Sequence, residues 1–383
     1  MMLPDRDAIA LLHDVVATPS VSGDEHPAVL LLIARMRELG YRAHIDHVGN
    51  VVGVIGSDDA EAVEIMLLGH VDTVPGRIPV RIEDGVLWGR GSVDAKGSLC
   101  AFIVAAASAE IPSNTRLVVV GAVGEETPSS PGASGVRDHY RPHACLIGEP
   151  SGWDRYTIGY KGRLLVHATF EQECGHTAGP VGAVAERAVT WHRRLVANVH
   201  EWNLGRESAF ATIQTNLQCF NTSSDGLHDT ARLTLGLRLP TWCDPHDLER
   251  DIRDVSGDGA LEFVGHAPAH RDSRTSELAN ALAGAIGDVG GRPTPTVKTG
   301  TSDMNTVARA FGCPIVAYGP GDSTLDHTPN ERLELAEYLR SIEVLRIAIF
   351  DITHRLSEAS SPTAPSAASS PPRPLESPRR SSG

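Results

Sequence analysis

Residues 64–72 read EIMLLGHVD, an apolar run of strand length that ends at a glycine and then presents a histidine and an aspartate. A short, continuous apolar run of this kind is typical of a strand buried on both faces, as in the sheet of an α/β protein. Similar runs recur at 117–123, 144–147 and 314–318, and segments with helical periodicity, such as 28–39, lie between them. This alternation predicts an α/β fold.

The middle of the chain has a different order of elements. Its segments are RLLVHATF (163–170), VGAVAERAVTWHRRLVANVH (181–200), ATIQTNLQCF (211–220), ARLTLGLRL (231–239), HDLERDIRDV (246–255) and ALEFVGHA (260–267). They read as βαββαβ, the ferredoxin-like split unit, which can close as a small sheet with two helices. We therefore predict an inserted domain at 159–267 and a discontinuous larger domain, 1–158 with 268–356, which ends in a long helix over 332–356.

Composition limits the classes of function. The 383 residues carry 48 acidic and 34 basic side chains, a formal charge of −14, which argues against general binding to nucleic acid or anionic membranes. The six cysteines form no CxxC pair, so neither a disulfide framework nor a thiolate zinc site is expected. We find no secretory signal pattern and no membrane-spanning run, and predict a cytoplasmic protein. Residues 357–383, rich in Ser, Pro and Ala, are predicted to be a disordered tail.

Candidate metal ligands follow the predicted strands. These are His70 with Asp72, Glu125 with Glu126, Glu149, and Asp326 with His327, one group for each strand. Ligands of an open α/β sheet bind beyond the carboxyl ends of its strands, so these groups are expected at one edge. Asp94 joins them because the glycines of GRGSVDAKG (89–97) allow a tight path around its carboxylate, although it could instead cap the following helix.

Two of these groups suggest specific chemistry. Adjacent carboxylates such as Glu125 and Glu126 raise each other's pKa, and a metal on one relieves that cost and leaves the other as a general base. The alternative is a solvated acidic turn. His70 and Asp72 lie two residues apart, so both face one side of an extended segment, where a second acceptor could orient a metal-bound imidazole.

Five motifs in order resemble the M20 metallopeptidases, the family of acetylornithine deacetylases, succinyl-diaminopimelate desuccinylases, aminoacylases and glutamate carboxypeptidases. They are HVDTVPG (70–76), GRGSVDAKG (89–97), GEE (124–126), IGEP (147–150) and DHTPNE (326–331). The resemblance covers residues 1 to about 356. It implies a zinc-peptidase-like α/β catalytic domain, a ferredoxin-like lid that forms a homodimer, and two Zn²⁺ or Co²⁺ ions per chain.

The resemblance also implies a role for individual residues. The implied metal ligands are His70 and Glu149 for one ion, Glu126 and His327 for the other, and Asp94 as the bridge. Asp72 would support His70, and Glu125 would be the catalytic base. His176, within ECGHTAGP (173–180), would reach the active site of the partner subunit, unless it is simply a surface histidine. NTSSDGLHD (221–229) departs from the family's Asn-Val-Ile-Pro stretch, which puts a substrate role for Asn221 in doubt.

Three stretches, 78–99, 121–135 and 297–305, resemble the LysK-type branch, which releases lysine or ornithine from an amino-group carrier protein. The loop Lys298, Thr299, Gly300, Thr301 and Ser302 could hold a substrate carboxylate or amine, or Ser302 or Asp303 could cap a helix. The carrier is acidic, so a basic patch is a further hypothesis, formed by Arg77, Arg81, Arg90, Lys161 and Arg163. The alternatives are an N-acetylornithine or N-acetyl-lysine deacetylase and a metal-free binding protein.

Overall fold

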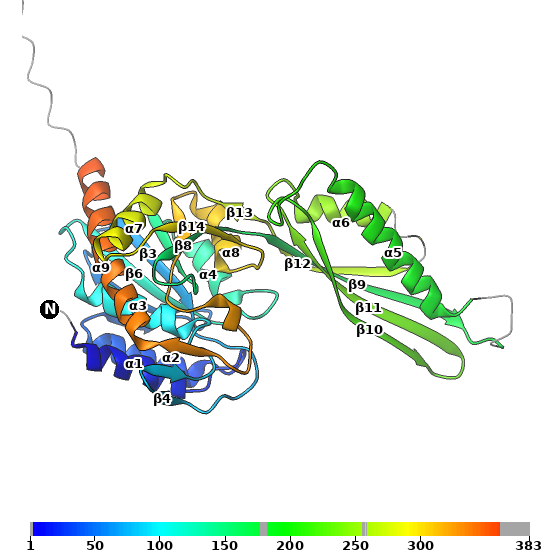
Figure 1. The fold of residues 1–383 in the computed structure, drawn as a ribbon, viewed down its shortest axis with the longest axis horizontal. Coiled ribbons are helices and arrows are strands. Elements are labelled where there is room, and N and C mark those ends of the chain that lie inside the picture. Colours follow the sequence, from blue (N-terminus) through cyan, green and yellow to red (C-terminus); the bar gives the residue numbers. More distant parts are fainter. Residues whose placement is uncertain (1–2, 177–181, 255–256, 258, 361–383) are drawn as a thin grey trace, which may run out of the picture.

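The computed structural model describes residues 3–176, 182–254, 257 and 259–360, which form a large α/β body and a smaller extension (Figure 1). The body is built on a mixed sheet. In spatial order its strands are β1 (Arg42–Ile45), β2 (Val51–Gly56), β6 (Thr115–Ala122), β3 (Val63–His70), β7 (Ala144–Gly148), β15 (Ile315–Ala317), β8 (Arg155–Tyr160) and β13 (His270–Arg271), with β14 (Thr294–Lys298) also paired to β8. The central strands β6, β3, β7 and β15 run parallel.

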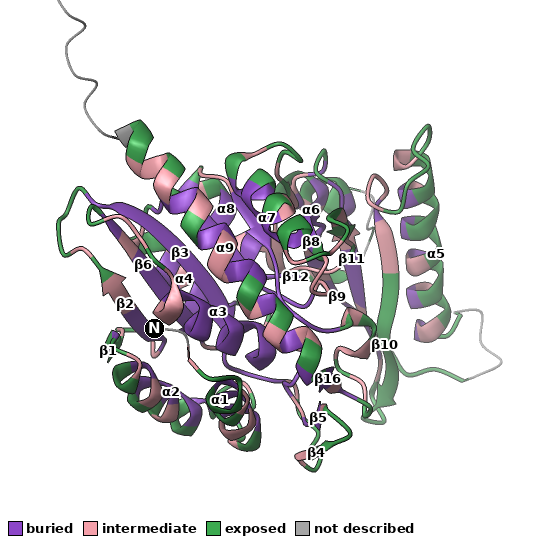
Figure 2. Ribbon diagram, turned by 60° about the vertical axis from the view of Figure 1, so that its left-hand side comes forward, coloured by how far each residue is buried: buried purple, intermediate pink, exposed green. Residues whose placement is uncertain are grey.

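Helices cover both faces of this sheet because its central strands are apolar on both sides. Along β3, Ile65 and Leu67 pack with one group of helices, whereas Met66 and Leu68 pack with the other. The first group is α1 (Asp5–Ala17), α2 (His26–Glu38), α3 (Lys96–Ser108), α7 (Glu277–Asp288) and α9 (Leu335–Ser360), and the second is α4 (Pro131–His139) and α8 (Asp303–Phe311). Figure 2 shows β3 and α3 as the most completely buried part of the body.

The extension, which we call the lid, comprises residues 162–267 and has its own sheet in the order β10, β11, β9, β12. Its elements are β9 (Gly162–Glu173), α5 (Val184–Trp202), β10 (Gln214–Ser224), β11 (His228–Leu239), α6 (Pro245–Asp254) and β12 (Ala260–Ala267). This is the predicted βαββαβ order, and α5 and α6 pack on the sheet in a separate apolar cluster. The α/β fold with an inserted ferredoxin-like lid is therefore confirmed.

Two sequence predictions differ from the structure at the end of the chain. Residues 332–334 were expected in the closing helix, but they form β16 (Arg332–Glu334), which pairs with β5 (Val86–Trp88) in a small sheet with β4 (Arg81–Glu83). A short 3₁₀ turn, η1 (Ser323–Leu325), precedes it. Helix α9 continues to Ser360, so the predicted tail cannot begin at 357, and its remainder lies outside the described residues. Among the described helices, none has the length and apolar character needed to cross a membrane.

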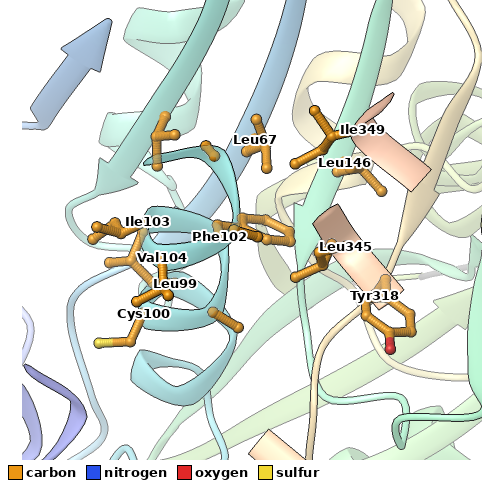
Figure 3. Packing of buried hydrophobic residues seen from close by; sticks show 14 of the residues in the cluster. Leu67, Leu99, Cys100, Phe102, Ile103, Val104, Leu146, Tyr318, Leu345 and Ile349 are labelled. Atoms are coloured by element: carbon orange, nitrogen blue, oxygen red, sulfur yellow. The ribbon is translucent and has the colours of Figure 1, made fainter. Parts of the chain in front are cut away.

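The core between the sheet and α9 offers a test of the packing. Phe102 on α3 is fully buried, lies beside Leu345 of α9 (Figure 3), and contacts the end of β7 at Gly148. Phe102→Ala is expected to lower the free energy of unfolding by about 3–5 kcal/mol, because it leaves a cavity there. Leu30→Ala on the half-exposed face of α2 is the control and should cost at most about 0.5 kcal/mol in urea unfolding. Similar losses in both variants would contradict this packing.

Candidate active site

The ends of the central strands bring the predicted ligands to one edge of the sheet. His70 is the last residue of β3, Glu149 follows the last residue of β7, and the Glu125–Glu126 pair lies three residues beyond β6. Because these three strands are parallel neighbours, their carboxyl ends lie side by side. Asp94 reaches the same place from the loop before α3, and His327 reaches it from the loop after β15.

Asp94 lies between two histidines in the manner of a bridging carboxylate. Its Oδ1 is 3.2 Å from Nε2 of His70, and its Oδ2 is 3.1 Å from Nε2 of His327. His327 Nε2 is also 3.0 Å from Oε1 of Glu126, and the ligand atoms of Asp94, Glu126 and His327 all lie within 4.8 Å of one another. Imidazole nitrogens and carboxylate oxygens are the ligands of catalytic zinc sites, so this donor set fits a metal.

Asp72 positions Glu125 and Glu126 as well as His70. Its backbone carbonyl is 3.0 Å from Nδ1 of His70, whereas its carboxylate is 3.5 Å away. The carboxylate instead accepts the backbone N–H groups of Glu125 at 3.0 Å and Glu126 at 3.1 Å, and the hydroxyl of Ser22 at 2.7 Å. Asp72 therefore holds the turn that carries Glu125 and Glu126, a role that the sequence analysis missed.

Glu331 holds the loop of Asp94 in a similar way. Its Oε1 accepts the N–H groups of Val93 and Asp94 at 3.0 and 3.1 Å, and its Oε2 pairs with Arg90 at 2.7 Å. The DHTPNE segment thus supplies both His327 and the carboxylate that orients Asp94.

Burial and crowding shift the pKa values of these groups. Burial raises the pKa of Glu125 well above its usual range, although the charge of His70 opposes this, and the nearby charges of Glu149, Asp303 and Glu126 add to it. Burial also raises the pKa of Glu149. Hydrogen bonds to Asp94 and Glu126 raise the pKa of His327 to about 10. A metal needs neutral imidazoles, so its binding must release protons.

These side chains line a cavity of about 590 Å³ between the body and the lid. The cavity is lined by Asp94, Glu125, Glu126, Glu149, Tyr160, Arg163, Arg238, Val297, Lys298, Thr299, Gly300, Thr301, Ser323, Asp326 and His327. Four members of the predicted substrate loop, residues 298–301, are among them. Ser302 instead caps α8, where it accepts the N–H of Met304 at 3.3 Å. Tyr160 and Arg238 were not predicted. Tyr160 ends β8, a strand that the sequence analysis did not identify, and Arg238 stands in a strand whose pattern indicated only a core.

The predicted basic patch is wrong for Lys161. For Arg77, Arg81 and Arg90 it stays a prediction, and Arg77 and Arg90 line one cavity. Lys161 is fully buried, and its ammonium group is bonded to the carbonyls of Ala209 and Thr212 and to the side chain of Gln214. Arg90 is bound to Glu331, and Arg163 points into the cavity. Lys161 joins β8 to β9 at the entry to the lid, where its neighbours Tyr160 and Gly162 are buried as well, which the sequence alone did not reveal.

His176 lies far from the cavity of its own chain. It is exposed and lies three residues beyond the end of β9, a strand that runs away from the body (Figure 1). Arg163, at the other end of β9, lines the cavity with Glu125. A strand of 12 residues spans about 40 Å at roughly 3.3 Å per residue, so the structure does not bring His176 to the other predicted residues of the same chain.

A second set of potential ligands lies on the lid. His246 and Glu249 on α6 and His266 on β12 have ligand atoms within 4.8 Å of one another. Glu249 is already bound by His266 at 2.6 Å and by Arg253 at 2.7 Å, and the two imidazole rings are stacked at an angle of 13°. Parallel rings do not direct their nitrogens at a common point, so this set is a surface network of hydrogen bonds.

Comparison with known proteins identifies the family. Residues 66–351 match the peptidase family M20/M25/M40. The chain belongs to this family. An M20 relative, the [LysW]-lysine hydrolase of Deinococcus radiodurans, is 47% identical over 364 residues, which cover 91% of this chain and 98% of the relative. The [LysW]-lysine/[LysW]-ornithine hydrolase of Saccharolobus islandicus is 28% identical, with 76% and 81% covered.

Solved structures, one of them described as an M20 family member, share the fold. The metallo-carboxypeptidase Sso-CP2 of Sulfolobus solfataricus gives a TM-score of 0.74 at 19% identity, covering 90% of this chain and 99% of that one. The aminopeptidase PepT of Bacillus cereus gives 0.73 at 17%, covering 92% and 100%. The resemblance inferred from the five motifs is confirmed, and this M20 protein is a metal-dependent hydrolase.

Proposed function

We propose that this M20 enzyme hydrolyses the amide bond between lysine or ornithine and an amino-group carrier protein, in lysine or arginine biosynthesis. The observation that carries the chemistry is the placement of Asp94 between His70 and His327 in a cavity that also contains Glu125. The substrate rests on the relative of 47% identity, which is named for [LysW]-lysine. The competing proposal is an N-acetylornithine or N-acetyl-lysine deacetylase, which would use the same chemistry on a smaller acyl group.

The proposed metal sites use the five predicted ligands. His70 and Glu149 would hold one divalent ion, Glu126 and His327 the other, and Asp94 both. His70 and Glu149 lie outside the tightest ligand group, but His70 is within 3.2 Å of Asp94 and Glu149 lines the same cavity. Bound divalent ions would acidify water and polarise the amide carbonyl. Zinc and cobalt both suit these ligands.

Glu125 is the proposed acid and base. Its backbone is fixed by Asp72, and its side chain lines the cavity, next to the proposed ligand Glu126. From there it would accept a proton from the attacking water and donate it to the departing α-amino group. A group that first accepts and then donates needs a pKa raised toward neutrality, which burial provides and nearby cations would moderate.

We further propose a homodimer formed through the lid, with domain boundaries at 1–158 plus 268–356 and 159–267. Strand β10 is an edge of the lid sheet and exposes Leu217 and Phe220, each at 40% (Figure 2 shows β10 mostly exposed). Long, unprotected edge strands favour pairing with another chain. A partner lid could then deliver its His176 to this cavity. Location in the cytoplasm stays a prediction.

The function is tested by substrate comparison. The purified, metal-loaded enzyme is incubated separately with carrier-linked lysine, carrier-linked ornithine, N-acetyl-lysine and N-acetylornithine, and the released amino acids are measured by mass spectrometry. We expect release from the carrier-linked forms at a kcat/KM well above that for the acetylated forms. Faster release from the acetylated compounds would favour the deacetylase instead.

The metal sites lead to a prediction of stoichiometry. Two divalent ions should bind per chain, and Glu126→Gln should lose metal affinity, because the variant removes a charged oxygen from the group of Asp94, Glu126 and His327. Elemental mass spectrometry after dialysis gives the number of metal ions bound per chain. Glu64→Gln, which removes a carboxylate paired with Arg116 away from the cavity, is the control and should keep both ions. Full activity with a single ion would contradict the arrangement.

A further inference from the structure

One wall of the active-site cavity contains buried polar atoms without partners. Asp326 Oδ1 and the Tyr160 hydroxyl are shielded from solvent, and neither has a hydrogen-bond partner among the described residues. Both residues line the 590 Å³ cavity, together with Val297. A buried acceptor without a partner is costly, and sites that bind polar ligands are where such atoms are expected.

The cations around this wall are held by other groups. The Lys298 ammonium group donates to the carbonyl of Pro150. Arg163 donates to the Pro128 carbonyl at 3.1 Å, and Arg238 donates to the Thr301 hydroxyl at 3.1 Å. These two arginines are opposite each other on the lid strands β9 and β11. The basic side of the cavity therefore comes from the lid, whereas the side that carries Asp326 comes from the body. Among the described residues Asp326 forms no ion pair, although Lys298 and His327 lie close enough to act on its charge.

The loop that carries Asp326 is held in place. Asp322 accepts the N–H of Thr324 at 2.9 Å at the start of η1, and Thr328 is bonded to Leu325 by both its N–H, at 3.1 Å, and its hydroxyl, at 2.9 Å. Asp326 directly precedes His327, a proposed metal ligand, so it stands beside the place where the scissile amide would be held. Because the turn is short and anchored, it would keep Asp326 at a fixed distance from that amide, and so select the length of the substrate side chain that begins there.

We propose that Asp326, with the hydroxyl of Tyr160, binds the distal ammonium group of the leaving amino acid, and that Val297 packs against its methylene groups. This inference rests on the proposed function and adds how a basic side chain is selected. A carboxylate and a phenol oxygen both accept hydrogen bonds from an ammonium group, and a charge-assisted bond in a shielded cavity discriminates strongly against an uncharged isostere. The spacing between Asp326 and the metal sites then sets the preferred length of the side chain.

The test compares three small substrates, the γ-glutamyl conjugates of the α-amino groups of lysine, ornithine and norleucine. Norleucine lacks the ammonium group but retains the chain length of lysine to within one atom. Asp326→Asn should reduce the ratio of kcat/KM for lysine over norleucine by about 10- to 100-fold, the range of a hydrogen bond to a charged group. Asp322→Asn, a matched loss of charge on the exposed side of the same loop, retains an oxygen that can accept the Thr324 N–H and should leave the ratio unchanged.

Two further measurements separate this role from structural damage. Metal content should be the same in parent and Asp326→Asn chains. Asp326→Glu keeps the charge but lengthens the side chain by one methylene, so it should shift the preference from lysine toward the shorter ornithine. If Asp326→Asn loses metal, this second variant tests the inference in its place. An unchanged lysine to norleucine ratio in a metal-loaded Asp326→Asn enzyme, or an unchanged lysine to ornithine ratio in Asp326→Glu, would overturn the inference. A parent enzyme that cleaves acetylated amino acids but none of these conjugates or the carrier-linked forms would instead refute the proposed function.

Discussion

Replacement of Glu125 by glutamine is expected to lower kcat by about a hundredfold to ten-thousandfold, the usual contribution of a positioned acid–base group. Glutamine has the same shape but cannot accept the proton of the attacking water or pass it to the departing amine. The backbone bond from residue 125 to Asp72 does not depend on the side chain, so the turn should stay in place. Turnover, circular dichroism and metal content measured on one preparation test this directly.

Glu126→Gln is the matched control, because it makes the same chemical change one residue away. It should lose metal first and regain part of its activity when excess metal is supplied, whereas excess metal should not rescue Glu125→Gln. Near-parental turnover of Glu125→Gln, or loss of metal from it but not from Glu126→Gln, would reverse the two assignments.

The sequence predicted the fold and the ligand set because both depend on local patterns. A run such as 65–69 is apolar at every position, so both of its faces must be covered, and the structure indeed places helices on both. A polar residue directly after such a run must lie at the edge of the sheet, which locates His70 and Glu149 without knowledge of the tertiary structure. The βαββαβ order of the lid follows from alternation within each strand in the same way.

The remaining contacts could not be predicted because they join residues distant in sequence. Glu331 bonds to the backbone of Asp94 from 237 positions away, and nothing local in DHTPNE distinguishes its last carboxylate from an exposed one. Lys161 looked like a surface charge, but its partners are carbonyls about 50 residues further along. The sequence showed Asp326 only as the neighbour of a predicted ligand, and the structure adds that its Oδ1 is buried in the cavity wall with no hydrogen-bond partner among the described residues.

His176→Ala is expected to lower turnover by about a hundredfold, in the range for loss of one group that stabilises the oxyanion, with little change in stability because the side chain is exposed. The structure sharpens the prediction. His176 follows the end of β9 opposite to Arg163, which lines the cavity, so within one chain the length of β9 separates the histidine from Glu125. If His176 acts in catalysis, it must do so in the cavity of a partner subunit.

Mixed dimers test this directly, because the two defects then fall in different cavities. When His176→Ala chains are combined with Glu125→Gln chains, one cavity of each mixed dimer receives an intact Glu125 from the first chain and an intact His176 from the second. The other cavity carries both defects. We therefore expect about one working site per mixed dimer, although each variant alone is nearly inactive, and turnover should rise with the fraction of mixed dimers. In the control mixture, chains with His192→Ala, a lid variant on α5, replace the His176→Ala chains. The His192→Ala chain should be active by itself, so this mixture controls for the effect of subunit exchange alone. If no activity is recovered in verified mixed dimers, His176 does not act across the interface, and the loss in His176→Ala must come from within the lid.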